Sequence, residues 1–197
     1  MTARRVAVAA GLIACAAGLA WLLFVGLPRW YAPSAPADAV TDRKAPESTG
    51  RKIKARLFYI AQTGTVLAGV ERDVPFGETP IEQARAIVNA QLEASAEPLV
   101  SAMPAGTTLR GLFLTAQGEA YVDFSSELAH AHPGGSLNEM LTIYTLVNAL
   151  TVNMPAVSSV QVLIDGKEVE TLAGHIDLRR PLAQNLSWVQ ESIVDSR

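Results

Sequence analysis

The chain has 197 residues and a formal net charge of -3, from 16 basic and 19 acidic side chains. This length suits one folded domain with accessory segments. The charge excludes the basic surface that a nucleic-acid-binding protein needs, so we expect no nucleic acid partner. The single cysteine, Cys15, allows no internal disulfide and no thiolate metal cluster, so packing alone must stabilise the domain.

The N-terminal segment is predicted to be a transmembrane helix. Residues 6–27 carry no charged side chain, and this length matches the roughly 20 residues that a helix needs to cross a bilayer. Arg4 and Arg5, within residues 1–5, favour a cytoplasmic N-terminus. We therefore expect a single-pass protein of the cytoplasmic (inner) membrane whose C-terminal domain is extracytoplasmic.

Three alternatives to this topology stay open. Arg29, Arg43 and Lys44 on the other flank reduce the charge asymmetry, and a reversed helix would put the domain in the cytosol. Residues 12–15, Leu-Ile-Ala-Cys, resemble a bacterial lipobox. In that case a lipidated Cys15 would become the mature N-terminus of a lipoprotein. Cleavage as a secretory signal is the third alternative, although signal cores are usually roughly 7–15 residues long.

Residues 28–52 are predicted to be a flexible linker. Their composition shifts to Ala, Pro, Ser, Thr and charged residues, with prolines at positions 33, 36 and 46. Such a stretch has too few large apolar side chains to bury the surface that folding requires. The domain that follows is therefore expected to stand away from the membrane on a tether.

The folded domain is predicted to span residues 53–182, followed by a C-terminal tail over residues 183–197. Residues 53–60 are rich in aromatic and aliphatic side chains and form the first predicted strand. Thr63-Gly64 is a turn signal, and residues 66–70 can continue as a second strand. A hairpin is therefore expected at the start of the domain.

A helix is predicted to begin after Thr79. Thr79 offers a capping hydroxyl, Pro80 suits the first helical position, and Glu82 is placed to bond back to the cap. Apolar residues then recur at helical spacing as far as Pro98, at Ile81, Ala84, Val88 and Leu92. This helix should pack through one apolar face.

A second hairpin and a second helix follow. Residues 108–115 and 120–124 are predicted to form an antiparallel strand pair because the turn between them is short. Ser136 and Glu139 have the spacing of a second capping box. The helix that begins there is apolar on most of its circumference, with Leu137, Met140, Leu141, Tyr144, Val147 and Leu150. We expect it to form the centre of the core.

The last predicted element is a hairpin. Residues 160–164 turn at Asp165-Gly166, a dipeptide that favours the positive φ angles of a two-residue turn. The order of elements predicts an α+β fold. We expect a two-layer sandwich, in which two helices pack on one face of a mainly antiparallel sheet of about four to six strands.

Five strings in the predicted domain support a more specific interpretation. They are Leu-Phe-Tyr at 57–59, Met-Pro-Ala-Gly-Thr at 103–107, Tyr-Val-Asp-Phe-Ser at 121–125, residues 146–157, and Val-Gln-Val-Leu-Ile-Asp-Gly at 160–166. In this order they resemble the GerMN domain family of sporulation and spore-germination proteins, over about residues 53–172. The resemblance implies an extracytoplasmic binding or assembly module, tethered by a lipid or a membrane helix, with which no catalytic residues are associated. The chain departs from the best-known members in having one such domain, a plain spanning helix and a tail after residues 174–178.

We assign no catalytic, cofactor-binding or metal-binding residues from the sequence. Gly-x-Ser-x-Gly elbows, glycine-rich phosphate loops and His-Glu-x-x-His pairs do not occur. His130 and His132 would offer two imidazoles to a metal ion. A third ligand would then have to come from Asp123 or His175. The preferred interpretation is a solvated loop with two surface histidines.

Two further positions admit a functional and a structural interpretation. Asp123 lies inside an apolar strand, where it could serve acid–base chemistry. The preferred expectation is that it accepts backbone N–H groups in the turn at residues 125–126. Gly134 and Gly135 precede a helix and could cradle an anion, or they could serve the backbone conformation alone.

The tail contains four large apolar residues, which are Leu186, Trp188, Val189 and Ile193. We expect a short amphipathic helix that packs on its own domain, with docking to a partner as the alternative.

These features predict a non-catalytic, membrane-anchored binding or assembly module of the bacterial cell envelope. Its expected partner is an envelope protein or peptidoglycan, held through an exposed apolar patch or an open sheet edge. The residues that bind, the oligomeric state and any sporulation role stay open. The alternative is a small-ligand-binding or hydrolytic envelope domain, which requires a concave pocket with converging polar groups.

Overall fold

The computed structural model describes Trp21 and residues 50–94 and 98–190. The chain divides into two units, residues 1–46 and 47–197, and the second unit is the folded domain described below. The predicted transmembrane helix, apart from Trp21, and nearly all of the predicted linker lie outside the described residues. Among the residues that are described, no helix has the length and apolar character needed to cross a membrane.

A long hairpin forms most of the first sheet. β1 (Lys52–Ile60) pairs antiparallel with β2 (Leu67–Pro75), and the short β8 (Val189–Gln190) joins the other edge of β2 in parallel. The hairpin was predicted, but β2 runs to Pro75 rather than ending at residue 70. Alternate side chains on both strands therefore extend the core further along the sheet.

The second sheet has the strand order β3-β4-β5-β6, with β7 also pairing with β5. These strands are β3 (Leu109–Leu114), β4 (Glu119–Phe124), β5 (Ser159–Ile164), β6 (Lys167–Glu168) and β7 (Leu182–Ala183). β4 and β5 are parallel. The chain between them forms α4 (Glu127–His130) and α5 (Ser136–Asn153), and this helical crossover returns it so that β5 runs in the same direction as β4.

The start of α3 (Pro80–Leu92) agrees with the sequence prediction. The backbone N–H of Glu82 donates to the Thr79 hydroxyl at 3.3 Å, and the Thr79 N–H donates to the Glu82 carboxylate at 3.0 Å. The predicted capping box is confirmed, with Pro80 in the first turn. The helix ends at Leu92, before Pro98.

The second predicted capping box is wrong. α5 begins at Ser136 with Gly135 as its N-cap at φ 86°, and no side chain caps this end. Gly135 can take the N-cap position because glycine tolerates a positive φ. The helix therefore begins at Ser136, one residue earlier than it would with Ser136 as its cap. The carboxylate of Glu139 bonds to a distant loop instead of the cap.

The predicted turn between β5 and β6 is confirmed. Asp165 has φ 50° and Gly166 has φ 75°, so both central residues occupy the left-handed region. This is the conformation that the Asp-Gly dipeptide favours in a two-residue hairpin.

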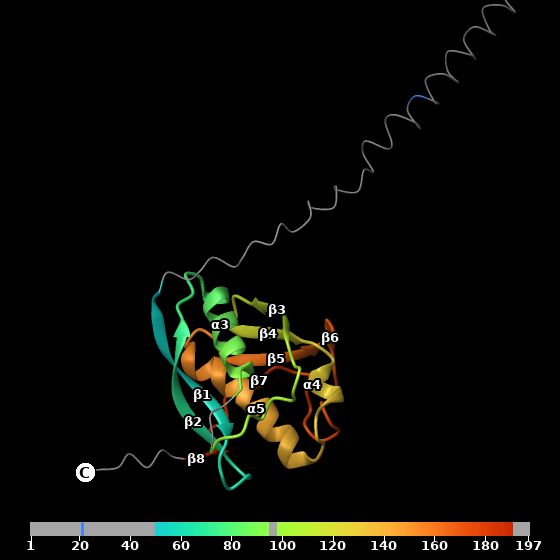
Figure 1. The fold of residues 1–197 in the computed structure, drawn as a ribbon. Helices are drawn as coiled ribbons and strands as arrows, with labels where there is room; N and C mark the ends of the chain where they lie inside the picture. Colours follow the sequence, from blue (N-terminus) through green and yellow to red (C-terminus); the bar gives the residue numbers. More distant parts are fainter. Residues whose placement is uncertain (1–20, 22–49, 95–97, 191–197) are drawn as a thin grey trace, which may run out of the picture. The chain divides into compact units, whose positions relative to one another are not determined.

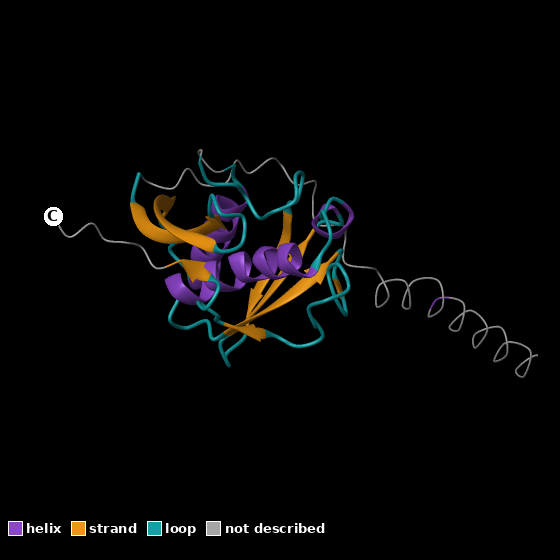
Figure 2. Ribbon diagram, turned by 90° about the horizontal axis from the view of Figure 1, so that it is seen from below, coloured by secondary structure: helices purple, strands orange, loops and turns teal. Residues whose placement is uncertain are grey.

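Figures 1 and 2 show the β1–β2 hairpin on one side of the helices and strands β3, β4 and β5 on the other. α5 contacts both β1 and β5, and α3 contacts β1, β2 and β3. The α+β class is confirmed, while the strands are divided between two sheets where the sequence predicted one. The core is centred on α5, with Leu141, Ile143, Leu146, Val147 and Leu150 buried.

The outer edge of β1 is closed by side chains. Gln91 of α3 is fully buried, and its carboxamide accepts from the Phe58 N–H at 2.8 Å and donates to the Phe58 carbonyl at 2.7 Å. Asn153 of α5 bonds to the N–H and carbonyl of Arg56 in the same way, both at 2.8 Å. A backbone bridge to Val100 occupies Ile60. Another strand cannot pair with β1 at these residues, because their N–H and carbonyl groups are already bonded.

The described part of the tail contains strands, so the predicted amphipathic helix is wrong there. β7 and β8 add to the two sheets, and between them the Asn185 backbone exchanges two bonds with the Asn148 side chain of α5, at 2.8 and 3.0 Å. The tail packs on its own domain as far as Gln190, which was the preferred expectation. Ile193 lies outside the described residues.

Replacing Gln91 by leucine tests the closure of β1. The variant Gln91→Leu leaves the N–H and carbonyl of Phe58 buried without partners, so we expect a loss of about 2–4 kcal/mol in the free energy of unfolding. Asn89→Leu on the exposed side of the same helix is the matched control and should change it by less than about 0.5 kcal/mol. Urea unfolding measures both, and equal effects would contradict this role of Gln91.

Candidate functional site

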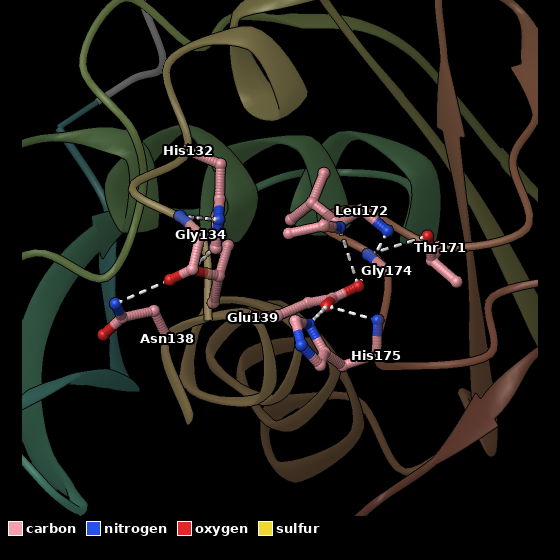
Figure 3. A network of polar contacts seen from close by, with 10 residues as sticks. His132, Gly134, Asn138, Glu139, Thr171, Leu172, Gly174 and His175 are labelled. Carbon is pink, nitrogen blue, oxygen red and sulfur yellow. Dashed lines mark hydrogen bonds and ion pairs between the residues drawn. The ribbon is translucent and has the colours of Figure 1, made fainter. Parts of the chain in front are cut away.

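A buried carboxylate lies in the first turn of α5. Glu139 has 0% exposure and accepts hydrogen bonds from the backbone N–H groups of Leu172 at 2.8 Å and Ala173 at 2.9 Å. The His175 N–H donates to its other oxygen at 2.8 Å. Figure 3 shows this loop folded around the carboxylate. The side chain therefore fixes residues 172–175 against the start of α5.

The protonation state of Glu139 follows from these contacts. Burial alone raises the pKa of a carboxyl group. The backbone N–H groups of Ala173, Leu172 and His175 outweigh that effect, and the pKa of Glu139 is lowered from its ordinary value. The group is thus a carboxylate held by peptide N–H donors, and it is not poised to give up or accept a proton near neutral pH.

His175 closes the same network from the solvent side. Its Nδ1 lies 3.1 Å from the carboxylate of Glu139, and its side chain is 46% exposed. Sequence reasoning missed this pairing because nothing in the spacing of the two residues indicates it.

His132 is bound within the protein rather than presented to solvent. Its Nδ1 accepts from the Gly134 N–H at 3.0 Å, so Nε2 carries the proton and donates to the Thr142 hydroxyl at 3.2 Å. That hydroxyl donates in turn to the Ala102 carbonyl at 2.8 Å. Both ring nitrogens of the neutral imidazole therefore have partners.

The structure does not bring together the histidines that the sequence offered as an alternative metal site. His130 ends α4 and is exposed, while His132 is committed to Gly134 and Thr142. His175 bonds to Glu139 instead. Within residues 50–94 and 98–190, no group of three His, Cys, Asp or Glu side chains is arranged to hold a metal ion.

The two glycines before α5 have a conformational role in the structure. Gly134 has φ 79° and Gly135 has φ 86°, values that side chains disfavour. The Gly134 carbonyl accepts from the Asn138 side chain at 2.8 Å (Figure 3). Together with the His132 contact, this anchors the loop to the helix.

Asp123 contacts a different turn from the predicted one. Its carboxylate accepts from the N–H of Gly166, in the β5–β6 turn, at 2.7 Å. The expected bond to the turn at residues 125–126 is absent from its described contacts, and Ser125 instead accepts from the Thr108 N–H at 3.1 Å. β4 and β5 are adjacent, so the Gly166 turn lies nearer to Asp123 than the chain order indicates.

A β-bulge places a guanidinium beside Asp123. Leu109 pairs with Phe124 and Gly111 with Asp123, so Arg110 is an extra residue in β3. Its Nε lies 3.8 Å from the carboxylate of Asp123, and its side chain also pairs with Asp165. Strict alternation along β3 would direct the Arg110 side chain toward the core. The bulge directs it to the side of Asp123 instead.

The open part of the second sheet lies beside this bulge. Gly111 and Phe113 on β3, and Glu119, Tyr121 and Asp123 on β4, occupy one face, which we call the outer face. The opposite face carries the buried residues Leu112, Ala120, Val122 and Phe124. Phe113 is 61% exposed and lies directly across from Tyr121. The side chain of Gln161 on β5 is covered, because it donates to the Leu178 carbonyl at 2.6 Å.

Carboxylates surround the two aromatic rings of the outer face. The Tyr121 hydroxyl lies 3.4 Å from the Glu119 carboxylate. The negative charge of Glu119, partial burial and the more distant Glu168 raise the pKa of Tyr121. The tyrosine is thus a neutral hydrogen-bonding group on a negatively charged surface. The arrangement offers an apolar contact area with a polar margin, which suits binding of a partner.

Comparison with known proteins gives the family. The family described as Germane, sporulation and spore germination, matches residues 56–170, which is more than half of the chain. The chain belongs to this family. No curated protein sequence matches significantly.

Two solved structures are similar to this chain. The tandem GerMN domains of the sporulation protein GerM from Bacillus subtilis align over 69% of this chain and 46% of that one, with 19% identity and a TM-score of 0.50. This chain thus spans less than half of that tandem structure. The first GerMN domain of the same protein aligns over 68% of this chain and 96% of that one, with 17% identity and a TM-score of 0.46. The likeness to the tandem domains shows the fold, and the family match confirms the resemblance seen in the sequence.

The variant Glu139→Gln tests the carboxylate of this GerMN domain. Gln keeps the size but removes the charge and points an N–H₂ group at backbone donors, so we expect a loss of about 2–3 kcal/mol at pH 7. Because the folded pKa is lowered, the stabilisation is present above the unfolded value of about 4.3 and is lost as pH falls through the folded pKa. Urea unfolding from pH 7 to 3 should show the two proteins converging at low pH. The exposed Glu170→Gln is the control, and a gap that does not narrow on acidification would argue against the assignment.

Proposed function

We propose that this chain is a membrane-anchored, extracytoplasmic binding or assembly module of the bacterial cell envelope and that it is not an enzyme. The observation that carries the proposal is the outer face, where Phe113 is 61% exposed beside Tyr121 on an otherwise folded sheet. Contiguous apolar patches with polar margins mark interaction sites, and the adjacent rings of Phe113 and Tyr121 supply the aromatic part of such a patch. Membership of the sporulation and germination family is consistent with an envelope partner.

The contacts of the polar side chains support a non-catalytic role. Asp123, Glu139 and His132 are three of the acidic and imidazole groups that could have served acid–base chemistry. Each of them accepts a backbone N–H donor in the folded domain. A general base must instead keep its acceptor atom available to the proton that it removes. These three groups stabilise turns and loops.

Photo-crosslinking in cells tests the binding face. We expect benzoylphenylalanine in place of Phe113 or Glu119 to give a reproducible adduct with an envelope component, because both side chains lie on the outer face. Glu71, which is exposed on β2 of the first sheet, is the control position and should give none. Adducts are identified by mass spectrometry. No adduct from the outer face, or equal adducts from all three positions, would contradict the proposal.

The anchor is the second part of the proposal. The uncharged run at residues 6–27 supports a spanning helix that holds the domain outside the cytoplasm. The alternative is a lipid on Cys15, which would require that thiol. Only the lipid anchor needs the sulfur atom of Cys15, so replacing that atom distinguishes the two anchors.

The variant Cys15→Ser separates the two anchors. A spanning helix does not need the thiol, so we expect the variant to remain in the membrane pellet after a carbonate wash, at the wild-type level. Protease added to spheroplasts should then degrade the domain. Release of the variant into the soluble fraction would favour the lipid anchor, and protection from protease would contradict an extracytoplasmic domain.

A further inference from the structure

The backbone of β3 has an edge that no described strand occupies. β3 stands at the end of the strand order and pairs with β4 alone. The Thr115 N–H donates to the Glu119 carbonyl at 2.9 Å, so residues 115, 113 and 111 direct their backbone groups to β4. In an antiparallel pair the alternate residues face the other way. The N–H and carbonyl groups of Leu112 and Leu114 therefore point to the open edge.

This edge has few of the features that usually prevent strand addition. Natural edge strands are protected by charged side chains, proline or a bulge. Residues 111–114 of β3 are Gly-Leu-Phe-Leu, with neither charge nor proline, and the bulge lies at the other end, at Arg110. The edge of β1, by contrast, is closed by Gln91 and Asn153. The domain thus closes the edge of β1 with side-chain bonds, while none of the described strands pairs with the edge of β3.

The charge beside this edge restricts what can pair with it. Glu119 and Asp123 lie on the outer face, Glu168 shares that face through its pairing with Leu163, and Asp165 lies in the adjoining turn. Among the described ion pairs, Arg110 bonds to two of these carboxylates, those of Asp123 and Asp165. The Lys167 side chain belongs to the opposite face, with Ile164. The surroundings of β3 are therefore negatively charged and favour a positively charged partner.

We propose that β3 accepts an extended, basic segment of a partner protein as an added strand. The segment pairs its backbone with Leu112 and Leu114 and places an apolar side chain on Phe113, while its lysine or arginine side chains face the surrounding carboxylates. This inference rests on the proposed binding function and names the class of partner. A second copy of this chain is disfavoured, because its own β3 would bring a second set of carboxylates to the first.

Synthetic peptides test the strand and its charge with the full chain in detergent micelles. The probes are an alternating lysine–valine nonapeptide, the same peptide with glutamate for lysine, and the lysine peptide methylated at alternate backbone nitrogens. We expect the lysine peptide to bind at least about tenfold more tightly than either of the others. Amide chemical shifts in isotope-labelled protein should move at Leu112 and Leu114. Equal binding of the methylated peptide, or shifts confined to other strands, would overturn strand addition.

Two variants locate the contact on the protein. Leu114→Pro removes an outward N–H without breaking a bond to β4, so we expect it to abolish binding of the lysine peptide. Phe113→Ala should weaken binding at least about fivefold and leaves the backbone unchanged. Thermal unfolding checks that both fold. If Leu114→Pro does not fold, the methylated peptide and Phe113→Ala still decide the matter.

The outcomes separate this inference from the proposed function. Crosslinks from position 113 in cells, without any peptide-induced shift at β3, would keep the binding module and overturn the strand partner. Binding of a disaccharide-tetrapeptide fragment of peptidoglycan at Phe113, in place of the lysine peptide, would likewise keep the binding module and overturn the strand partner. A dimer in sedimentation that Phe113→Ala dissociates would assign the edge to a second copy and overturn the proposal.

Discussion

The structure depends on side-chain carboxamides that take the place of a neighbouring strand. A carboxamide carries one acceptor and a donor, so it can satisfy both backbone groups of one residue. Gln91 does this for Phe58, and Asn153 does it for Arg56 two residues away along β1. Because one amide comes from α3 and the other from α5, both helices are fixed to the same edge. Loss of either would leave backbone groups without partners in the core.

Polar side chains along α5 make the same kind of contact, a hydrogen bond to the backbone of another segment. Its first turn binds the loop at residues 172–175 through Glu139. Its middle binds the backbone of Asn185 through Asn148, and its last residue binds β1 through Asn153. A helix buried on nearly all sides thus needs polar side chains to hold the segments that cover it. These contacts hold residues 182–190 against the domain.

The two sheets consequently differ in what they offer to a partner. The edge of β1 has all its alternate backbone groups bonded from Arg56 to Ile60. The edge of β3 carries an exposed aromatic ring and backbone groups directed outward. At the edge of β3 an exposed aromatic ring thus lies next to backbone groups that no described strand pairs with, close to a group of carboxylates. A binding module benefits from such an arrangement because shape, backbone pairing and charge select the same partner.

Local sequence determined the features that neighbouring residues control. Thr79, Pro80 and Glu82 act within one helical turn, and Asp165-Gly166 sets its own turn through φ angles. The five strings likewise indicated the GerMN family, and the order of the predicted elements indicated the α+β class. Short-range chemistry of this kind can be read directly from the chain.

Tertiary structure alone decided the rest, because the partners are far apart in the sequence. Glu139 has the spacing of a capping residue, yet its donors lie 33 to 36 residues away. Asn153 bonds to a strand 97 residues before it, and no local pattern in the sequence indicates this bond. The bulge at Arg110 likewise depends on how β3 meets β4. A residue type limits which bonds a side chain can make, and only the folded chain determines which donor or acceptor reaches it first.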